Sequence, residues 1–522
     1  MQPTSHDSLE SLTRQPCGRR RLWAHRSLAV ACALLLPGYT LAQTPTPSFS
    51  MLGYLEELEL DNLADPLSGG SLVVNGVKVL LPANLLFKMP GQYLTVNDLF
   101  RGRHPGAAPA LAAVTRPSGL ALKDVPRPAV PFEVQVFGNI VNGQYRAGGA
   151  SLTQQDLNAG AGFIRAIDHA RGEMLVGPDA GTAVARVRIN DVPGRYGLAN
   201  AAKVGGGAFD DRFASDSGNA PVSAETGFPM CLPRVAPPAT DPLCPLTNRA
   251  PVPNTGRFTC GPVAFEATAP PHWPSNASLR CDPRLPAPLL VGDYITFNGM
   301  LTEDTLGSGS YFHAAHAVHA MAGIYTSPGV DPAYVFIEEA LAGTLGEPYP
   351  GIDQEQTSRF RLVGFVTDPS RRVDVFLVDV AGSGEAERRL TTLSPSSVGQ
   401  VGRIRITLPA KANFLPMTRE VRIRIEGHTS SKVAGGLDSG QYTAPIAEFI
   451  YPENTRFGRP RSPVSVPFEN FCFLKNGGGL LGTLGRDALP DAARPPILAL
   501  NPFPSSGHTA SQPRANGTAS CP

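Results

Sequence analysis

The sequence predicts a mainly β protein, built from two copies of a five-strand unit and a β-sandwich-like domain after them. Three observations indicate this fold class. Short stretches with alternating polarity recur along most of the chain, and this is the period of a half-buried strand. Glycine (54) and proline (52) make up about a fifth of the 522 residues, so turns are frequent. Related stretches occur twice between residues 50 and 320.

Residues 1–42 have the pattern of a signal peptide. The positive stretch CGRRRLWAHR precedes the apolar stretch SLAVACALLLPGYTLA, which is too short to span a bilayer. The small residue Ala42 precedes the expected cleavage site. A twin-arginine signal at residues 19–20 and lipidation of Cys32 are rival interpretations, and both fit the flanking residues less well. We therefore expect a secreted or periplasmic chain, with no transmembrane segment after cleavage.

The first unit covers residues 43–155, with an insertion at about residues 82–131. It begins with GYLEELEL, continues with GGSLVVNGVKVLL, and ends with FEVQVFGNIVNGQYRAGGASL. The middle stretch predicts a hairpin, because Asn75-Gly76 is a strong signal for a two-residue turn. The insertion contains NLLFKMPGQYLTVNDLF, which we expect to be helical or irregular.

The second unit covers residues 160–322 and repeats this order. GFIRAIDH corresponds to the first strand, GEMLVGPDAGTAVARVRI to the hairpin, and DYITFNGMLTEDTLGSGSYFHAAHAV to the last two strands. Its insertion, at about residues 192–289, carries four cysteines. Two strand units with a long insertion after the third strand are therefore expected in tandem.

These motifs resemble the OB-like modules of unknown function found in exported bacterial proteins. The shared features are a glycine–aromatic–aliphatic strand, a V-N-G hairpin and a late strand pair of the V-x-F-x-G type. The resemblance covers about residues 50–320 outside the insertions. It implies two small five-stranded barrels in tandem and supplies no catalytic residue.

The sequence pattern changes after the second unit. GRIRITLP and REVRIRIEG alternate strictly, and RFRLVGFVTDPSRRVDVFLVDV predicts two strands around a turn. Residues 327–452 are therefore expected to form the β-sandwich-like domain. Residues 453–522 are rich in proline and glycine, and we expect this segment to be ordered only in patches.

Six cysteines remain after signal cleavage, which indicates disulfides in an exported chain. They are Cys231, Cys244, Cys260, Cys281, Cys472 and Cys521. Sequence neighbours suggest pairing in that order, two by two. The four clustered cysteines still allow three connectivities, which the spacing leaves open.

Three histidines are close together in YFHAAHAVHAMAGIYT: His313, His316 and His319. In a helix they would follow one flank and form a candidate metal site. In the expected strand, His313 and His319 would share one face and His316 would point away from them. The strand interpretation therefore predicts that the three do not converge on a metal.

A candidate anion-binding face is formed by four arginines, if the two strands that carry them pair. Arg403 and Arg405 alternate with isoleucines in one strand, and Arg422 and Arg424 alternate with aliphatic residues in another. Four aligned guanidinium groups would suit carboxylates, sulfates or phosphates. An ordinary solvated face, balanced by nearby acidic residues, is the alternative.

The acidic loop FDDRFASDSGN, with Asp210, Asp211 and Asp216, is rich in the oxygen ligands that calcium prefers. Arg212 and Ala214 occupy positions where oxygen ligands would be needed, so we expect a solvated loop instead. No G-x-S-x-G motif is present, and six paired cysteines would leave no thiol nucleophile. The sequence provides no signal for a cofactor.

A non-enzymatic exported binding protein is the function that these observations favour. A net charge of +1 gives no indication of nucleic acid as a partner. If the four arginines share a face, an anionic polysaccharide or surface polymer is the expected ligand, because an exported protein rarely meets nucleic acid. A secreted hydrolase whose site is assembled from distant loops is one alternative. A structural or adhesive surface protein is the other.

Overall fold

The computed structural model describes the chain in sixteen stretches. They are residues 48–101, 117–154, 158–200, 209–216, 218–249, 257–260, 281–305, 307–343, 360–381, 384–408, 418–446, 448–450, 455–456, 459–460, 474 and 499–504. The expected signal peptide, Cys472 and Cys521 lie outside these residues.

The described residues are mainly β, as the sequence predicts. They form strands β1 to β28, and the α-helix among them is the six-residue α1 (Val96–Arg101). Within these stretches, no helix has the length and apolar character needed to cross a membrane.

The first sheet closes on itself through five strand positions. Its strands are β1 (Ser48–Tyr54), β2 (Glu57–Leu60), β3 (Gly70–Val74), β4 (Val77–Leu81), β7 (Glu133–Val141) and β8 (Gln144–Thr153). β1 and β2 are successive segments of one interrupted strand. Four of its strand pairs are antiparallel: β2–β3, β3–β4, β8–β7 and β7–β1. The pair β4–β8 is parallel. The pairing therefore returns to the strand on which it began.

The predicted turn of the first hairpin is confirmed. Asn75 has φ 52° and Gly76 has φ 72°, so both residues are in the left-handed region between β3 and β4. Such a pair matches the right-handed twist of the flanking strands. Asn142 and Gly143 form the same kind of turn between β7 and β8, with φ values of 53° and 75°.

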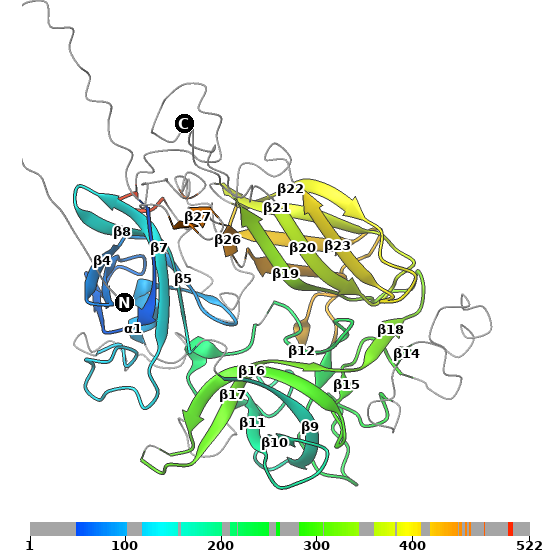
Figure 1. Ribbon diagram of the computed structural model, residues 1–522. Coiled ribbons are helices and arrows are strands. Elements are labelled where there is room, and N and C mark those ends of the chain that lie inside the picture. The colour runs from blue at the N-terminus through cyan, green and yellow to red at the C-terminus, as the bar shows by residue number, and fades with distance from the viewer. Residues whose placement is uncertain are drawn as a thin grey trace, which may run out of the picture. The chain divides into compact units, whose positions relative to one another are not determined.

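The second sheet has the same order of pairing. Its strands are β9 (Ala159–Asp168), β10 (Glu173–Gly177), β11 (Ala185–Ile189), β16 (Tyr294–Glu303) and β17 (Tyr311–Ala320). β9–β10, β10–β11, β16–β17 and β16–β9 are antiparallel, and β11–β17 is parallel. The long β16–β17 hairpin is prominent in Figure 1.

Both insertions add strands to these sheets. In the first, β5 (Leu86–Lys88) pairs with β8 and with β6 (Tyr93–Thr95), so part of the stretch expected to be helical or irregular is β. In the second, β12 (Val222–Ala224) pairs with β17. The other pairs are β13 (Met230–Cys231) with β15 (Ala287–Pro288), and β14 (Arg257–Cys260) with β18 (Gly323–Thr326).

The last part of the chain forms a β-sandwich. One sheet has the order β23-β20-β19-β26, and the other has the order β22-β21-β24-β25. The first consists of β19 (Val335–Gly343), β20 (Phe360–Val366), β23 (Arg403–Leu408) and β26 (Glu448–Ile450). The second consists of β21 (Val373–Ala381), β22 (Gly384–Leu393), β24 (Glu420–Ile425) and β25 (Gln441–Pro445). Aliphatic residues of both sheets share one buried core, because alternation places every second side chain inward.

A short C-terminal stretch returns to the first sheet. Ala83 and Asn501 exchange two backbone hydrogen bonds, of 2.7 and 3.1 Å. Leu500 is buried in the core of the first sheet, as is Leu474. Beyond the sandwich, β27 (Thr455–Arg456) pairs with β28 (Arg459–Pro460). Some residues of the proline- and glycine-rich segment are therefore well packed.

Candidate functional site

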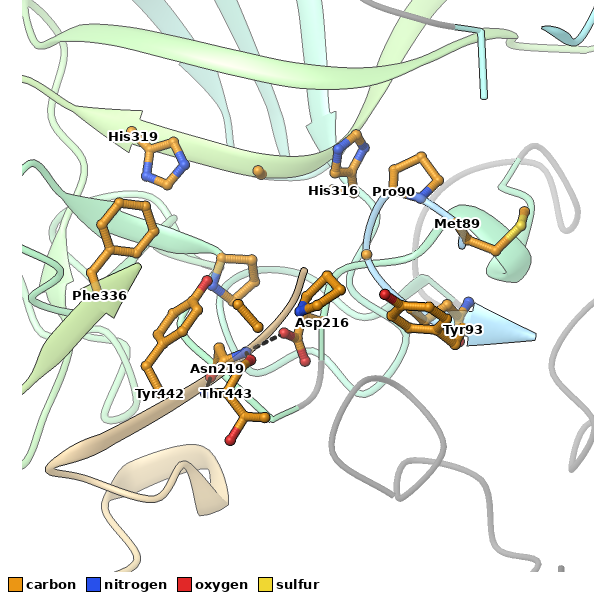
Figure 2. A pocket seen from close by; sticks show the side chains of 16 residues that line it. Met89, Pro90, Tyr93, Asp216, Asn219, His316, His319, Phe336, Tyr442 and Thr443 are labelled. Atoms are coloured by element: carbon orange, nitrogen blue, oxygen red, sulfur yellow. Dashed lines mark hydrogen bonds between the residues drawn. The ribbon is translucent and has the colours of Figure 1, made fainter. Parts of the chain in front are cut away.

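Five segments of the described part of the chain line a pocket of about 130 Å³ (Figure 2). One water molecule needs about 10–15 Å³ by a comparable measure, so the pocket has room for a small organic molecule. The segments are the β5–β6 turn, the loop before β12, strand β17, strand β19 and strand β25.

The β5–β6 turn is held against the loop before β12 by one amide side chain. The Nε2 group of Gln92 donates hydrogen bonds to the carbonyl oxygens of Asp211 and Arg212, at 2.7 and 2.9 Å. This contact fixes the turn that presents Pro90 and Tyr93 to the pocket.

The loop before β12 is packed against the first sheet, so the expectation of a solvated loop is wrong. Arg212 Nη1 donates to the carbonyl oxygens of Leu99 and Ser118, at 2.6 and 2.8 Å. Phe213 is buried in the core of the first sheet. The arginine is accommodated because its donors are satisfied by backbone acceptors and by Asp210.

Asn219 connects this loop to β25. Its Oδ1 accepts a hydrogen bond from the backbone N–H of Thr443 at 3.2 Å, and its Nδ2 donates to the Thr443 carbonyl at 2.8 Å. Nδ2 also donates to Asp216 Oδ2, and the N–H of Gly218 donates to Asp216 Oδ1 at 2.7 Å. The carboxyl group of Asp216 is thereby held at the pocket wall (Figure 2).

A β-bulge places His316 and His319 on the same pocket. Asn298 pairs with Ala317 but Gly299 pairs with Ala315, so His316 is an extra residue in β17. A Cβ atom at Gly299 would lie 2.8 Å from the Ala314 carbonyl oxygen, so this close approach favours glycine. Figure 2 shows both imidazoles on the side of the pocket opposite Asp216.

The predicted sharing of a face by His313 and His319 is therefore wrong. The bulge shifts the alternation by one residue, and it is His316 that joins His319. The His313 ring packs against Phe297, with ring centroids 5.1 Å apart. In the described stretches, no group of three or more His, Cys, Asp or Glu side chains is placed to hold a metal ion.

The two pocket histidines differ in their hydrogen bonding. Ser223 Oγ lies 3.0 Å from His319 Nδ1, which leaves Nε2 of that ring for another partner. Nδ1 of His316 is buried and has no hydrogen-bond partner among the described residues. The Phe336 ring lies beside His319 and Tyr442, at centroid distances of 5.2 and 5.4 Å.

Burial shifts the pKa values of the titratable groups of the pocket toward their uncharged forms. It lowers the pKa of His316 and of His319 to about 4, and for His316 the neighbouring His319 adds to the effect. Burial also raises the pKa of Asp216 to about 7, against the hydrogen bonds from Gly218 and Asn219. The pKa values of Tyr93 and Tyr442 are raised by burial, so both phenols stay protonated.

The four arginines of the candidate anion-binding face do not lie together. β23 pairs with β20 in one sheet, whereas β24 pairs with β21 and β25 in the other. Arg403 forms an ion pair with Glu338 at 3.1 Å, and Arg405 is exposed elsewhere on β23. The expectation of one four-arginine face is wrong, because strand alternation does not specify which strands pair.

Glu387 on β22 forms ion pairs with the other two arginines, Arg422 and Arg424. Arg422 Nη1 lies 2.7 Å from its Oε1, and Arg424 Nη2 lies 2.6 Å from the same oxygen. Arg422 is buried and also donates to Thr443 Oγ1 at 2.8 Å. These cations are thus satisfied within the protein and are not aligned for an anionic polymer.

Two expected disulfides are present in the described part of the chain. Cys231 is bonded to Cys244 with a Cα–Cα distance of 5.9 Å, and Cys260 to Cys281 with 5.0 Å. Both hold the second insertion. The expected pairing of Cys472 with Cys521 stays a prediction.

Sequence reasoning missed Tyr93 of the first unit, and Phe336 and Tyr442 of the β-sandwich-like domain. The available signal was the Met-Pro-Gly-Gln-Tyr turn, where an aromatic residue follows a tight bend.

No protein-family model, no curated protein sequence and no solved structure matches the chain.

Proposed function

We propose that the chain is an exported binding protein that holds a small uncharged molecule in the pocket between β17 and β25. The observation that carries this proposal is the unmet hydrogen-bonding capacity of four pocket side chains. Nδ1 of His316 is buried without a hydrogen-bond partner among the described residues, and no hydrogen bond to another described residue is found for the Tyr93 and Tyr442 hydroxyls or for His319 Nε2. A buried polar atom without a partner costs free energy, and the other three groups are free to bond a molecule in the pocket, so a ligand that pairs with them would be stabilised.

Export is supported by the residues themselves. The N-terminal charged and apolar stretches have the pattern of a signal peptide. Disulfides such as Cys231–Cys244 persist in oxidising compartments. We further propose that both of these sheets are built on OB-like modules, an assignment supported by their shared pairing order and by the parallel pairs β4–β8 and β11–β17, which occupy the same place in that order.

In this proposal the modules provide the rigid support for the pocket. β17 supplies both histidines, and the first insertion supplies Tyr93. Several segments hold the polar groups in place before a ligand arrives. Such preorganisation lowers the ordering cost of binding.

A secreted hydrolase is the second candidate, favoured by the composition of the pocket. A carboxyl group with a pKa of about 7 faces imidazoles that are neutral at that pH, and such groups can donate and accept protons. Ser223 is fully buried behind His319, so it is a positioning residue and not an accessible nucleophile.

The test is ligand-detected NMR of the purified chain with a library of small neutral molecules. The molecules that bind the wild type are expected to bind more weakly to the Tyr93→Phe, Tyr442→Phe double variant, which removes two hydroxyls and keeps the rings. The matched control is Tyr54→Phe, because Tyr54 is 51% exposed and is not a pocket residue. Molecules that bind equally well to the wild type and to the double variant would contradict the proposal. Conversion of a bound molecule into a product would favour the hydrolase.

A further inference from the structure

Resting on the proposed binding function, we infer that the ligand is a neutral polyhydroxylated ring, namely a single sugar residue that presents neighbouring hydroxyl groups to Tyr93, Tyr442, His316 and His319. Four properties of the pocket support this inference: the hydrogen-bonding types of its side chains, the absence of lysine and arginine from its described lining, its apolar surfaces and its volume.

The hydrogen-bonding types select hydroxyl groups. A neutral imidazole offers one donor and one acceptor, and a phenol offers a donor and acceptor on the same oxygen. A ligand that carries only carbonyl or ether oxygens would leave the imidazole acceptors unpaired. A ligand that carries only N–H groups would leave the donors unpaired. Hydroxyl groups both donate and accept, so several close together can satisfy all four side chains.

The charge of the pocket argues against an ionic ligand. Among the described residues, the lining contains no lysine or arginine, and its one carboxyl group, on Asp216, accepts hydrogen bonds from Gly218 and Asn219. A carboxylate or sulfate would be desolvated without a cationic partner. The anionic polymer expected from the sequence is therefore unsuited to this pocket, and a neutral sugar is favoured.

The apolar part of the lining suits the C–H face of a sugar ring. Phe336 and Tyr442 meet edge to face, with an interplanar angle of 87°, and Pro90 and Met89 lie across from them (Figure 2). A pocket with apolar walls and a few convergent polar groups orients a ligand that has both kinds of surface. The volume of about 130 Å³ suits one ring and not an extended chain.

The ring can come from two sources, a free monosaccharide or the terminal residue of a neutral glycan. Calorimetric titration with neutral aldohexoses and N-acetylhexosamines tests the first source, and an array of neutral glycans tests the second. At least one of them is expected to bind. Its permethylated form, which only accepts hydrogen bonds, and the corresponding uronate are each expected to bind at least tenfold more weakly.

Two variants separate a ligand contact from a structural role. Tyr93→Phe is expected to weaken sugar binding roughly two- to tenfold, the loss of about one hydrogen bond. It should not lower the thermal unfolding temperature of the free protein, because the hydroxyl has no partner among the described residues there. Tyr54→Phe is the control and should change neither property.

The outcomes distinguish this inference from the proposed function. If the pocket binds other neutral molecules from the library, and neither the sugars nor the glycans bind, the sugar inference is wrong and the binding function stands. If a sugar binds equally well to wild type and to the Tyr93→Phe, Tyr442→Phe variant, it binds elsewhere and the inference is also overturned. If no molecule depends on the pocket residues, both are wrong.

Discussion

Arg249 and Asp293 form a doubly hydrogen-bonded ion pair that solvent does not reach. Nη2 of the arginine lies 2.6 Å from Oδ1 of the aspartate, and Nη1 contacts Oδ2 and lies 3.0 Å from the Pro288 carbonyl oxygen. The side chains are 0% and 2% exposed. The pair therefore connects the second insertion to the residue directly before β16.

Breaking this pair is expected to destabilise the protein strongly. Arg249→Met leaves the Asp293 carboxylate buried without its cation, which costs about 3–5 kcal/mol in comparable pairs. Urea unfolding measures the change. The matched control is Arg284→Met, because Arg284 is 72% exposed in its pair with Asp282, where solvent screens the interaction, so this substitution should change the free energy of unfolding far less. Equal effects of the two substitutions would contradict the role given to Arg249.

The Cys231–Cys244 disulfide is expected to contribute on the order of 3 kcal/mol to the free energy of unfolding. It closes a loop with a sequence separation of 13 residues, and the constraint acts mainly on the unfolded chain. Replacing both cysteines by alanine should lower the urea midpoint, whereas thiol titration of the unreduced wild type should detect neither cysteine. A free thiol at either position would refute the pairing.

Local pattern was enough to predict individual strands and turns. The alternation in GRIRITLP and REVRIRIEG corresponds to β23 and β24, and Asn75-Gly76 forms the turn between β3 and β4. Each of these features depends on neighbouring residues only. Period-two alternation shows which side chains of a strand share a face, but it does not identify the partner strand. The alternation of the four arginines therefore could not show that β23 and β24 lie in different sheets.

The pocket could not be predicted for two physical reasons. One extra residue in β17 reverses the faces after the bulge, and nothing in YFHAAHAVHA marks His316 as that residue. Asp216 lies in a polar loop that becomes buried because Arg212 finds backbone acceptors more than ninety residues away in sequence, a long-range contact. The two aromatic residues of that loop, Phe209 and Phe213, were the available sign of burial.

The C-terminal stretch is expected to stabilise the first sheet. Leu500 is 3% exposed within its core, and Asn501 is paired with Ala83. Leu500→Ala should lower the free energy of unfolding by about 2–5 kcal/mol, through lost burial and a cavity. Val398→Ala is the control, because that side chain is 73% exposed. An unchanged urea midpoint for Leu500→Ala would show that the stretch does not pack there in solution.

Asp216 is expected to make stability fall as the pH rises from about 4 to 7. Burial raises the pKa of its carboxyl group from 3.8 to about 7, so in this range the folded protein retains a proton that the unfolded chain has released. The contribution is fully present below pH 4 and is lost as the pH passes through 7, with a size on the order of 4 kcal/mol.

The measurement is the difference in free energy of unfolding between wild type and Asp216→Asn, followed against pH. Any constant effect of the amide cancels from the slope. His316 and His319 act in the opposite direction, because their lowered pKa values make stability rise with pH between about 4 and 6.5. Both proteins carry these histidines, so the difference removes their contribution. A flat difference from pH 4 to 7 would mean that Asp216 is already ionised in the folded protein, and the pocket would then hold a full negative charge at neutral pH.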